Sequence, residues 1–393
     1  MENYSIYSLA KKYYPETVRI RHEIHMNPEL GFEEFHTSKI ITETLESIGI
    51  ETHKNIAKTG VVGILRGNHP GKTILLRADM DALPINEETS LDYCSKVKNK
   101  MHACGHDGHT AGLLGAAMIL SELKDYIHGN IKFLFQPAEE TDGGALPMIE
   151  EGVLENPKVD AAFGCHLWGG TEEGKINIKH GPAMAAPDTF SFTIIGKGGH
   201  GAMPHLAIDP ITICSQVINH IQSIISRNIN PLQPAVISFG TINGGDTFNA
   251  IPSEVTVSGT IRTFDEKVRK TIPIAIENIL KAQKVSHNCD YKFHLEEKFP
   301  ALINDHKMTD FIKGSLSKVV GDENVLELEE PSMGGEDFAH FTKRVPSSFF
   351  FVGISKDLSD PVIHHHPSFQ WDDKNLLKVS ASFAQITMDF LKE

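Results

Sequence analysis

The chain has 393 residues, which is long for one compact domain, so the sequence predicts two domains. Its net charge of -14, from 51 acidic and 37 basic side chains, argues against a nucleic-acid partner, whose phosphates require a basic surface. No apolar run approaches the ~18 residues that a membrane span needs, and the N-terminus lacks the apolar segment of a secretory signal. Five scattered cysteines favour free thiols in a reducing compartment, so we expect a cytoplasmic protein without a membrane partner.

Four short apolar segments each lead into polar residues, which is typical of buried strands in an α/β sheet. These segments are 73–78, 130–135, 160–165 and 348–354, and the residues that follow them include Asp79, Glu139, His166 and a histidine triplet at 364–366. The chain up to residue 50 and the segment 109–126 are predicted to be mainly helical. Because ligand sites of open α/β sheets lie beyond the carboxyl ends of the strands, we expect the functional site among these polar residues.

The segment 187–298 has a different pattern from the rest of the chain. Phe190, Phe192 and Ile194 alternate with polar residues, which predicts a strand with one buried face. The further predicted elements are a helix at 208–227, strands at 235–242 and 254–263, a helix at 266–283 and a strand at 291–295. The order β-α-β-β-α-β is that of a ferredoxin-like α+β domain. We therefore expect a larger α/β domain, 1–186 and 299–393, into which this α+β domain is inserted.

The segment Cys104-Gly-His106-Asp-Gly-His109 precedes a predicted helix and contains a thiol and an imidazole two residues apart. Either histidine alone is more typical of a helix cap or of a core position. Together with Cys104, and with a glycine that permits close approach, His106 is more typical of metal binding.

Two adjacent carboxylates, Glu139 and Glu140, follow a strongly apolar predicted strand. Such a pair is usually a solvated turn, but its position after this strand favours a buried edge of the sheet. Neighbouring residues at a strand end point in different directions, so one carboxylate can bind a metal while the other faces a substrate.

Two further histidine segments complete the pattern: His166 follows another predicted strand, and the triplet 364–366 follows the last one. A triplet alone could be a solvated loop. Five potential ligands for two divalent ions that share a bridge are then Cys104, His106, Glu140, His166 and one histidine of the triplet. Glu139 remains as a candidate general base. Amide hydrolysis needs this combination, because a metal pair activates a water and polarises the carbonyl while a carboxylate transfers the proton.

A series of motifs along nearly the whole chain indicates a resemblance to a known protein family. The motifs are RHEIHMNPELGFEE at 21–34, RADMDALP at 77–84, HACGHDGHTAGLLGAA at 102–117, FQPAEE at 135–140, GCHLW at 164–168, GKGGHGAMPH at 196–205, FNAIPSEV at 248–255, MGGEDFAHF at 333–341 and HHPSF at 365–369. With them the chain resembles the aminoacylase and carboxypeptidase type of co-catalytic metallopeptidases. It is most similar to the subfamily of hippurate hydrolases, auxin-conjugate hydrolases and N-acyl amino acid deacetylases. The resemblance implies a metal-dependent amidohydrolase that cleaves N-acyl amino acids or related small amides.

The resemblance also implies roles for individual residues. Cys104 would bridge two metals as a thiolate, with His106 and Glu140 completing one site and His166 and His365 the other. His365 is selected from the triplet because the pattern His-X-Pro-X-aromatic of the subfamily begins there. Glu139 would be the general base.

The inserted domain would supply further site residues as a lid and dimerisation domain. His200 would stabilise the oxyanion, in its own subunit or in a partner subunit, and Asn249 would assist it. Arg262 would bind the substrate carboxylate, although a strand arginine in a surface salt bridge is an alternative. Glu336, in the segment after the inserted domain, would line the pocket or serve as a structural partner. Similar proteins use the inserted domain as a dimer interface, so we expect a homodimer or a dimer of dimers.

The chain departs from the wider superfamily at the metal site. Many relatives have His-X-Asp where this chain has Asp79-Met-Asp81, and a bridging Asp in place of Cys104. The closer subfamily shares both changes, so Asp79 is not expected to be a ligand, and Asp81 is expected at most to support one. A thiolate ligand favours zinc or cobalt over magnesium, and manganese is also described for relatives, so zinc or manganese is predicted and cobalt is possible.

Two other functions compete with this interpretation. A dipeptidase or carboxypeptidase on the same scaffold would differ in how it recognises the amine or side chain of its substrate. A non-catalytic, metal-stabilised binding protein is the alternative from a different class. The presence of Glu139 together with all five potential ligands argues against this alternative, because a protein that has lost catalysis should have lost some of them.

Overall fold

The computed structural model describes residues 5–141 and 143–392, and the chain divides into two compact units. The larger unit comprises Met1–Ala183, Ile303–Glu330 and Asp337–Glu393. The smaller unit comprises Met184–Leu302 and Pro331–Glu336. Among the described residues, no helix combines the length and the apolar character that crossing a bilayer requires.

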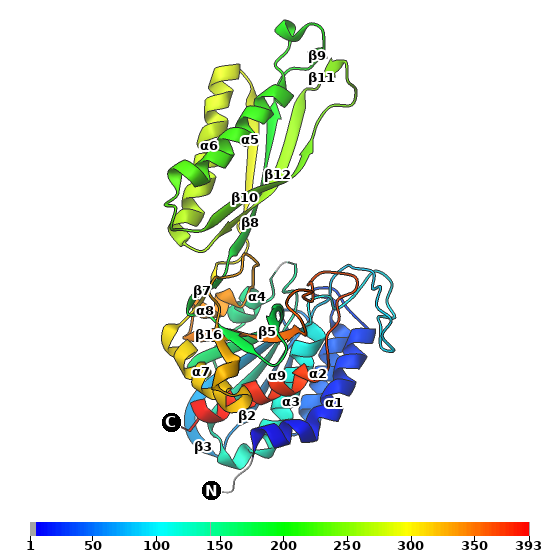
Figure 1. Cartoon of the computed structure of the whole chain (residues 1–393), viewed down its shortest axis with the longest axis vertical. Helices are drawn as coiled ribbons and strands as arrows, with labels where there is room; N and C mark the ends of the chain where they lie inside the picture. Colours follow the sequence, from blue (N-terminus) through cyan, green and yellow to red (C-terminus); the bar gives the residue numbers. More distant parts are fainter. Residues whose placement is uncertain (1–4, 142, 393) are drawn as a thin grey trace. The chain divides into compact units, whose positions relative to one another are not determined.

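An eight-stranded mixed sheet forms the centre of the larger unit (Figure 1). Its strands, in spatial order, are β1 (Glu51–Ile56), β2 (Gly60–Arg66), β4 (His128–Gln136), β3 (His69–Asp79), β5 (Ala161–Glu172), β16 (Ser347–Ser355), β6 (Ile176–Ile178) and β15 (Val325–Glu327). The central strands β4, β3, β5 and β16 run parallel, whereas β1, β2 and β6 pair antiparallel with a neighbour. The predicted α/β class with a mixed sheet is therefore confirmed.

Helices flank this sheet, and three of them, α1, α3 and α9, pack against one another. The helices of the larger unit are α1 (Ile6–Met26), α2 (Phe35–Ser47), α3 (His106–Glu122), α4 (Ala145–Glu150), α7 (His306–Val320), α8 (Ala339–Thr342) and α9 (Asn375–Phe390). Helix α3 is buried from His106 to Leu120, which suits its alanines, glycines and leucines. At Gly112 a Cβ atom would lie only 2.3 Å from Cγ1 of Val379, so this glycine permits the close approach of α9.

Short elements complete the larger unit. They are the 3₁₀ turns η1 (Lys124–Tyr126) and η3 (Asp322–Asn324), and the paired strands β7 (Gly181–Met184) and β14 (Leu302–Asn304), which reach the boundary of the unit. The sequence did not predict these elements, nor the strands β1, β2, β6 and β15, because most of them are short or lack a clear alternation of polar and apolar residues.

One predicted strand end is wrong. His166 was expected directly after a strand, but it lies within β5, which continues to Glu172. The reason is that the two neighbours of β5 end at different points: β3 pairs with it only as far as Gly164, whereas β16 pairs with it as far as Glu172. His166 therefore lies beyond the last residue of β5 that pairs with β3, while the β16 side of the strand stays paired.

The smaller unit is a four-stranded antiparallel sheet with two helices. Its elements are β8 (Ala186–Ile195), α5 (Pro210–Asn228), β10 (Ala235–Asn243), β12 (Glu254–Thr263), α6 (Glu266–His287) and β13 (Asp290–Glu296), with the short strands β9 (Gly199–His200) and β11 (Ala250–Ile251) and the turn η2 (Pro204–Leu206). The order β-α-β-β-α-β is the one expected of a ferredoxin-like fold.

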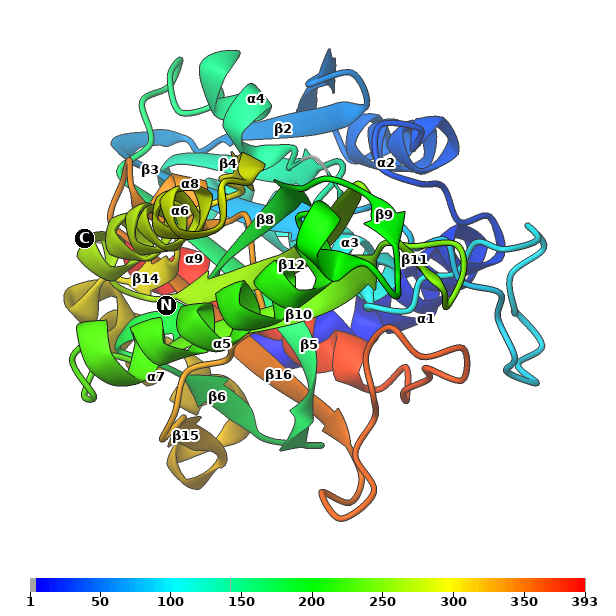
Figure 2. The ribbon, with the colours of Figure 1, turned by 90° about the horizontal axis from the view of Figure 1, so that it is seen from above.

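The apolar face of this sheet is covered by its two helices. Phe190, Phe192 and Ile194 of β8 are buried in one core with the apolar residues of α5 and α6, as the alternating pattern predicts. Figures 1 and 2 show α5 and α6 side by side on this face. In the spatial order β10-β12-β8-β13, strand β10 is an edge strand, and β12 is its one neighbour among the described strands.

Candidate metal centre

A group of histidine, cysteine and carboxylate side chains gathers beyond the carboxyl ends of β3 and β4. Strand β3 ends at Asp79, and β4 ends at Gln136, three residues before Glu139. The site therefore lies where ligand sites of open α/β sheets are expected.

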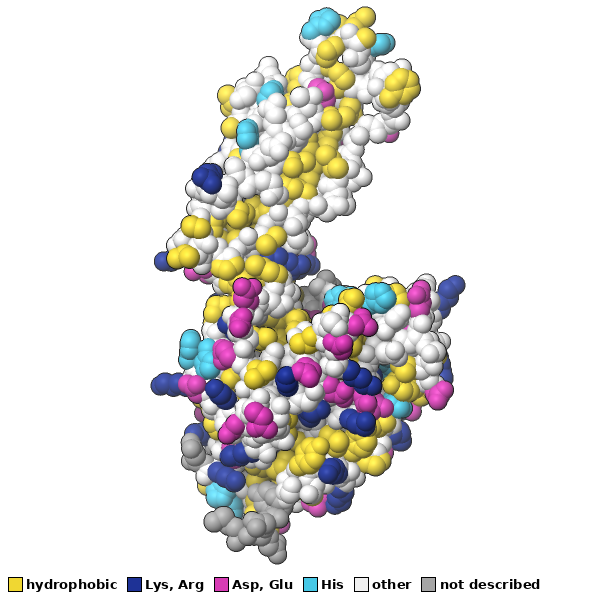
Figure 3. Space-filling model, viewed as in Figure 1, with side chains coloured by type: hydrophobic (Ala, Val, Ile, Leu, Met, Phe, Trp, Pro, Cys, Tyr) yellow, Lys and Arg dark blue, Asp and Glu magenta, His cyan; other side chains and the backbone are white. Residues whose placement is uncertain are grey.

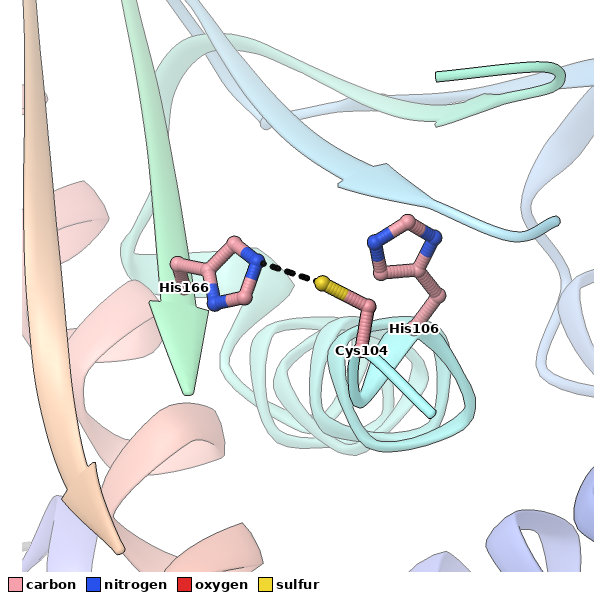
Figure 4. A group of neighbouring side chains, drawn as sticks. All are labelled: Cys104, His106 and His166. Atoms are coloured by element: carbon pink, nitrogen blue, oxygen red, sulfur yellow. Dashed lines mark hydrogen bonds between the residues drawn. The ribbon is translucent and has the colours of Figure 1, made fainter. Parts of the chain in front are cut away.

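Cys104, His106 and His166 point toward one another in this group (Figure 4). Cys104 lies in the loop before α3, His106 is the first residue of that helix, and His166 belongs to β5. The Sγ atom of Cys104 lies 3.4 Å from Nε2 of His166. Gly105 between the first two has a φ of 92°, a left-handed conformation that glycine adopts without strain, so the chain can turn sharply into the helix.

The hydrogen bonds of His106 leave one of its nitrogens available as a ligand. Its Nδ1 lies 3.2 Å from Oδ1 of Asp81, and a carboxylate only accepts, so Nδ1 carries the proton. The Nε2 atom is buried without a hydrogen-bond partner among the described residues, so a metal ion can take the place of a proton on it. A buried imidazole nitrogen of this kind is the arrangement in which a carboxylate orients a histidine toward a metal.

The same argument applies to His166. Its Nδ1 donates to the carbonyl oxygen of Leu167 at 2.6 Å, so Nε2 presents its lone pair to Sγ of Cys104. His109 differs, because its Nδ1 lies 2.6 Å from Oδ1 of Asp79 and its Nε2 accepts from the backbone N–H of Leu167 at 2.8 Å. Both nitrogens of His109 are thus occupied, which argues against a role as ligand.

Glu140 and His365 form a second group with Cys104. The Nε2 atom of His365 is 3.1 Å from Oε1 of Glu140, which in turn is 3.8 Å from Nε2 of His106. His365 has a φ of 58°, an uncommon conformation outside glycine, and its N–H donates to the carbonyl of Ala103 at 2.8 Å. This bond ties the histidine triplet to the residue before Cys104.

Glu139 is buried beside the same group. One of its carboxylate oxygens lies within 4.8 Å of a ring nitrogen of His106 and of a carboxylate oxygen of Glu140. Ala138, directly before it, has a φ of 55°, and its N–H donates to Oε1 of the buried Glu34 at 2.9 Å. The side chain of Glu34 thus holds the loop that carries Glu139 and Glu140.

The electrostatics of the group fit a bound cation. Burial disfavours a charged His106, but Asp79, Asp81 and Glu140 outweigh it and raise the pKa of His106 to about 10. Burial, with Glu140 and Glu139 nearby, raises the pKa of the Cys104 thiol well above its ordinary value. Burial lowers the pKa of His166 well below its ordinary value, which keeps it neutral. A thiolate here requires a compensating positive charge, and divalent ions supply one.

The structure brings together the five residues that were predicted as ligands in this region. His200 on β9 pairs with Ala250 on β11, directly after Asn249, and both His200 and Asn249 are exposed. Arg262 on β12 is half-buried and forms no salt bridge within 4.0 Å among the described residues, so the predicted alternative of a surface ion pair is not seen. Glu336 ends the short segment of the smaller unit, next to Asp337 of the larger unit.

Three residues that contact the proposed ligands, or support the segments near them, were not predicted from the sequence. His364 lies with Nδ1 3.8 Å from Sγ of Cys104, and burial lowers its pKa to about 3. Glu34 supports the loop before Glu139, and Asp337 accepts from Nε2 of Gln136 at 2.8 Å and from the N–H of Ala145 at 3.1 Å. The only sequence signal for Glu34 and Asp337 was that both lie within the motifs that carry the resemblance. Their contacts could not be predicted, because they join distant parts of the sequence.

Comparisons with known proteins show which family this chain belongs to. A family model for Peptidase family M20/M25/M40 matches residues 75–389. Thermostable carboxypeptidase 2 of Saccharolobus solfataricus is 43% identical over 369 residues, which cover 93% of this chain and 92% of that protein. The N-acyl-L-amino acid amidohydrolase of Geobacillus stearothermophilus is 47% identical over 290 residues, 74% of this chain and 78% of that protein.

A solved structure is also similar along almost the whole chain. The YXEP protein of Bacillus subtilis, described as a dinuclear metal binding peptidase of the M20 family, matches with a TM-score of 0.84 and 33% identity. The match covers 97% of this chain and 99% of that one. The resemblance inferred from the motifs is confirmed: the chain belongs to peptidase family M20/M25/M40.

Proposed function

We propose that this protein is a two-metal amidohydrolase that cleaves the amide bond of N-acyl amino acids. Membership of the peptidase family makes the chain a hydrolase of amide or peptide bonds. The observation that carries the proposal is the arrangement of four donor side chains around Cys104, with Glu139 within 4.8 Å of His106 and Glu140.

The proposed ligands would hold two ions, with Cys104 serving both. His106 and Glu140 would complete one site, which the 3.8 Å separation of Nε2 and Oε1 supports. His166 and His365 would complete the other. When bound, the ions polarise the substrate carbonyl and lower the pKa of a water. Zinc or manganese is proposed, and cobalt is compatible, because thiolate and imidazole ligands favour softer ions than magnesium.

Glu139 is the proposed general base. Its carboxylate takes a proton from the attacking water and passes it to the amide nitrogen as the C–N bond breaks. The products are a carboxylic acid from the acyl group and the free amine of the amino acid. The loop held by Glu34 keeps the Glu139 carboxylate beside the ligand cluster, which is the positioning that proton transfer requires.

The smaller unit is proposed as a lid that contributes to substrate binding. The Nδ1 atom of His200 accepts from the N–H of Ala202 at 3.1 Å, so the proton lies on Nε2, the form that can donate to an oxyanion. Asn249 would assist from the neighbouring strand. Arg262 would bind the substrate carboxylate, and Glu336 would line the pocket.

The substrate class is the point at which two functions compete. The carboxypeptidase of Saccharolobus solfataricus fits the alternative of a carboxypeptidase or dipeptidase. The amidohydrolase of Geobacillus stearothermophilus has the higher identity, 47%, and its name matches the proposed substrate. We therefore favour N-acyl amino acids over dipeptides.

A cytoplasmic homodimer, or a dimer of dimers, is the proposed assembly, with the smaller unit as interface. One side of its edge strand β10 has no partner strand in the described part of the chain, and an unpaired edge can bind a second strand. Exposed apolar side chains lie on or near this strand, including Val236, Ile242 and Phe248. Figure 3 shows hydrophobic side chains on the surface of this unit.

Metal analysis followed by a substrate screen tests the proposed function. The metal-loaded protein should hydrolyse N-acetyl and N-benzoyl amino acids faster than dipeptides with the same C-terminal residue. Glu139→Gln should lose ~10²–10⁴-fold in kcat and retain its metals, because the amide keeps the shape but cannot take the proton. Faster hydrolysis of dipeptides would favour the carboxypeptidase alternative, and near-normal turnover by Glu139→Gln would contradict the assigned base.

A further inference from the structure

The three consecutive histidines at 364–366 have three different environments. His365 faces Oε1 of Glu140, and His366 is exposed, with its Nδ1 accepting from the N–H of Ser368 at 3.1 Å. His364 turns inward instead, and its Nδ1 lies 3.8 Å from Sγ of Cys104, within the range of a hydrogen bond to sulfur. Sequence patterns select one histidine of the triplet as a ligand and assign no role to His364.

The protonation of His364 follows from its second nitrogen. Its Nε2 lies 3.0 Å from the backbone nitrogen of Gly169, which can only donate, so Nε2 must be the acceptor. The proton of the neutral ring is therefore on Nδ1, and the N–H bond is directed at Sγ of Cys104. A protonated Nδ1 has no lone pair to offer a metal, which distinguishes His364 from His106 and His166.

The ring of His364 is also held in place by its neighbours. Its centroid lies 5.2 Å from those of Trp168 and His166 and 5.1 Å from that of Phe369. Aromatic contacts on several sides and a backbone hydrogen bond leave the imidazole little freedom to rotate. The donor therefore stays directed at the sulfur.

We propose that His364 is a positioning residue that donates an N–H···S hydrogen bond to the Cys104 thiolate and thereby tunes the ligand shared by the two metals. The inference rests on the proposed function, in which Cys104 is that ligand. A hydrogen bond to a thiolate stabilises its lone pairs and fixes the direction in which they point. Losing such a bond should weaken metal binding, since partners that orient ligands are typically worth ~10–100-fold in metal affinity.

Two substitutions separate the two hydrogen bonds of His364. In His364→Asn the side-chain N–H group can take the place of Nδ1 and still face Sγ, while the acceptor for Gly169 is lost. In His364→Gln the amide oxygen can take the place of Nε2 and accept from Gly169, while the donor to Sγ is lost. His366→Gln is the matched control, because the same change is made in the same triplet at an exposed position.

The readout is the absorption of the cobalt-loaded protein, in which a thiolate ligand gives a charge-transfer band in the near ultraviolet. His364→Gln should shift this band to longer wavelength, because sulfur lone pairs without the hydrogen bond are higher in energy. It should also bind cobalt ~10–100-fold more weakly while still reaching the wild-type stoichiometry. His364→Asn and His366→Gln should keep the band close to its wild-type position.

Four results would each decide against the proposal or its premise. An unshifted band in His364→Gln would exclude the hydrogen bond, and one fewer cobalt ion per chain at saturation would make His364 a ligand. A wild-type protein that binds cobalt without any thiolate band would instead refute the proposed role of Cys104. If His364→Gln does not fold, His364→Asn still tests the proposal, because a band shifted to longer wavelength in that variant would contradict the donor role.

Discussion

Asp81 connects two of the proposed ligands through its two carboxylate oxygens. Its Oδ1 lies 3.2 Å from Nδ1 of His106, and its Oδ2 accepts from the backbone N–H of Glu140 at 3.0 Å. One buried carboxylate thus orients the ring of His106 and holds the backbone N–H of Glu140 in place. His106 begins helix α3 and Glu140 lies in the loop after β4, so Asp81 sets their relative position.

Asp81→Asn should therefore weaken metal binding without removing a ligand. The amide group would present an N–H to either the Nδ1–H of His106 or the N–H of Glu140, and two donors cannot form a hydrogen bond. We expect affinity to fall by ~10–100-fold, measured by competition with a chelator. Asp360→Asn, at an exposed position, is the control. Equal affinities in Asp81→Asn and the control would show that Asp81 does not orient the ligands.

Glu34 should make stability depend on pH in a defined window. Burial raises its pKa from 4.5 to about 7, despite its hydrogen bonds to Thr59 and Ala138. Because the folded state then holds the proton more tightly, this contribution to stability is fully present below pH 4.5 and is lost as the pH rises to about 7. Glu34→Gln cannot lose a proton, and its amide oxygen can still accept from Ala138.

The thermal midpoints of Glu34→Gln and wild type, compared between pH 5 and 8, measure this effect. The midpoint of the variant minus that of wild type should increase across the window and level off above about pH 7. Comparing two proteins at each pH cancels the titration of the other groups. A difference that stays constant with pH would mean that Glu34 does not titrate in this range.

Arg262→Ala should affect the binding of charged substrates selectively. A hydrogen bond to a charged group is worth about 1.5–3 kcal/mol, so KM for an N-acyl amino acid should rise by about 10–100-fold. KM for the corresponding amide, which has no carboxylate, should change little. Arg262→Lys should recover part of the loss. Equal increases for the acid and the amide would remove Arg262 from the proposed carboxylate site.

Mixing two inactive variants tests whether His200 acts in a partner subunit. In randomly formed dimers of Glu139→Gln and His200→Ala, half are hybrids. If His200 acts across the interface, one site of each hybrid has both residues intact, and activity should recover to about a quarter of wild type. If it acts in its own subunit, each site retains one defect. No recovery, despite subunit exchange demonstrated by mass spectrometry, would exclude action in the partner subunit.

The sequence predicted the proposed ligands but, apart from Asp81, not the residues that hold them. Cys104, His106 and Glu140 lie in short motifs whose residue types suggest metal chemistry, so their grouping could be inferred before the fold was known. The supports come from distant segments: Glu34 contacts a residue 104 positions away, and His364 and Cys104 are separated by 260. Such contacts depend on how the strands are ordered in the sheet, which local patterns do not reveal.

The prediction of strand lengths from the sequence was limited in the same way. The apolar segment that leads to His166 indicates where β5 begins, but its end depends on pairing with β16, which lies more than 180 residues later in the chain. In the smaller unit, where neighbouring strands are closer in sequence and one face is buried, β12 was predicted with its observed bounds, 254–263.

The central claim is that two metal ions, held around Cys104, are required for hydrolysis of N-acyl amino acids. The most direct test is to remove all metal with a chelator and to measure the hydrolysis of an N-acetyl amino acid as zinc or manganese is added back in known equivalents. The account predicts no activity without metal and a rise that saturates near two equivalents per chain. Full activity at one equivalent, or activity in protein that mass spectrometry shows to be metal-free, would contradict it.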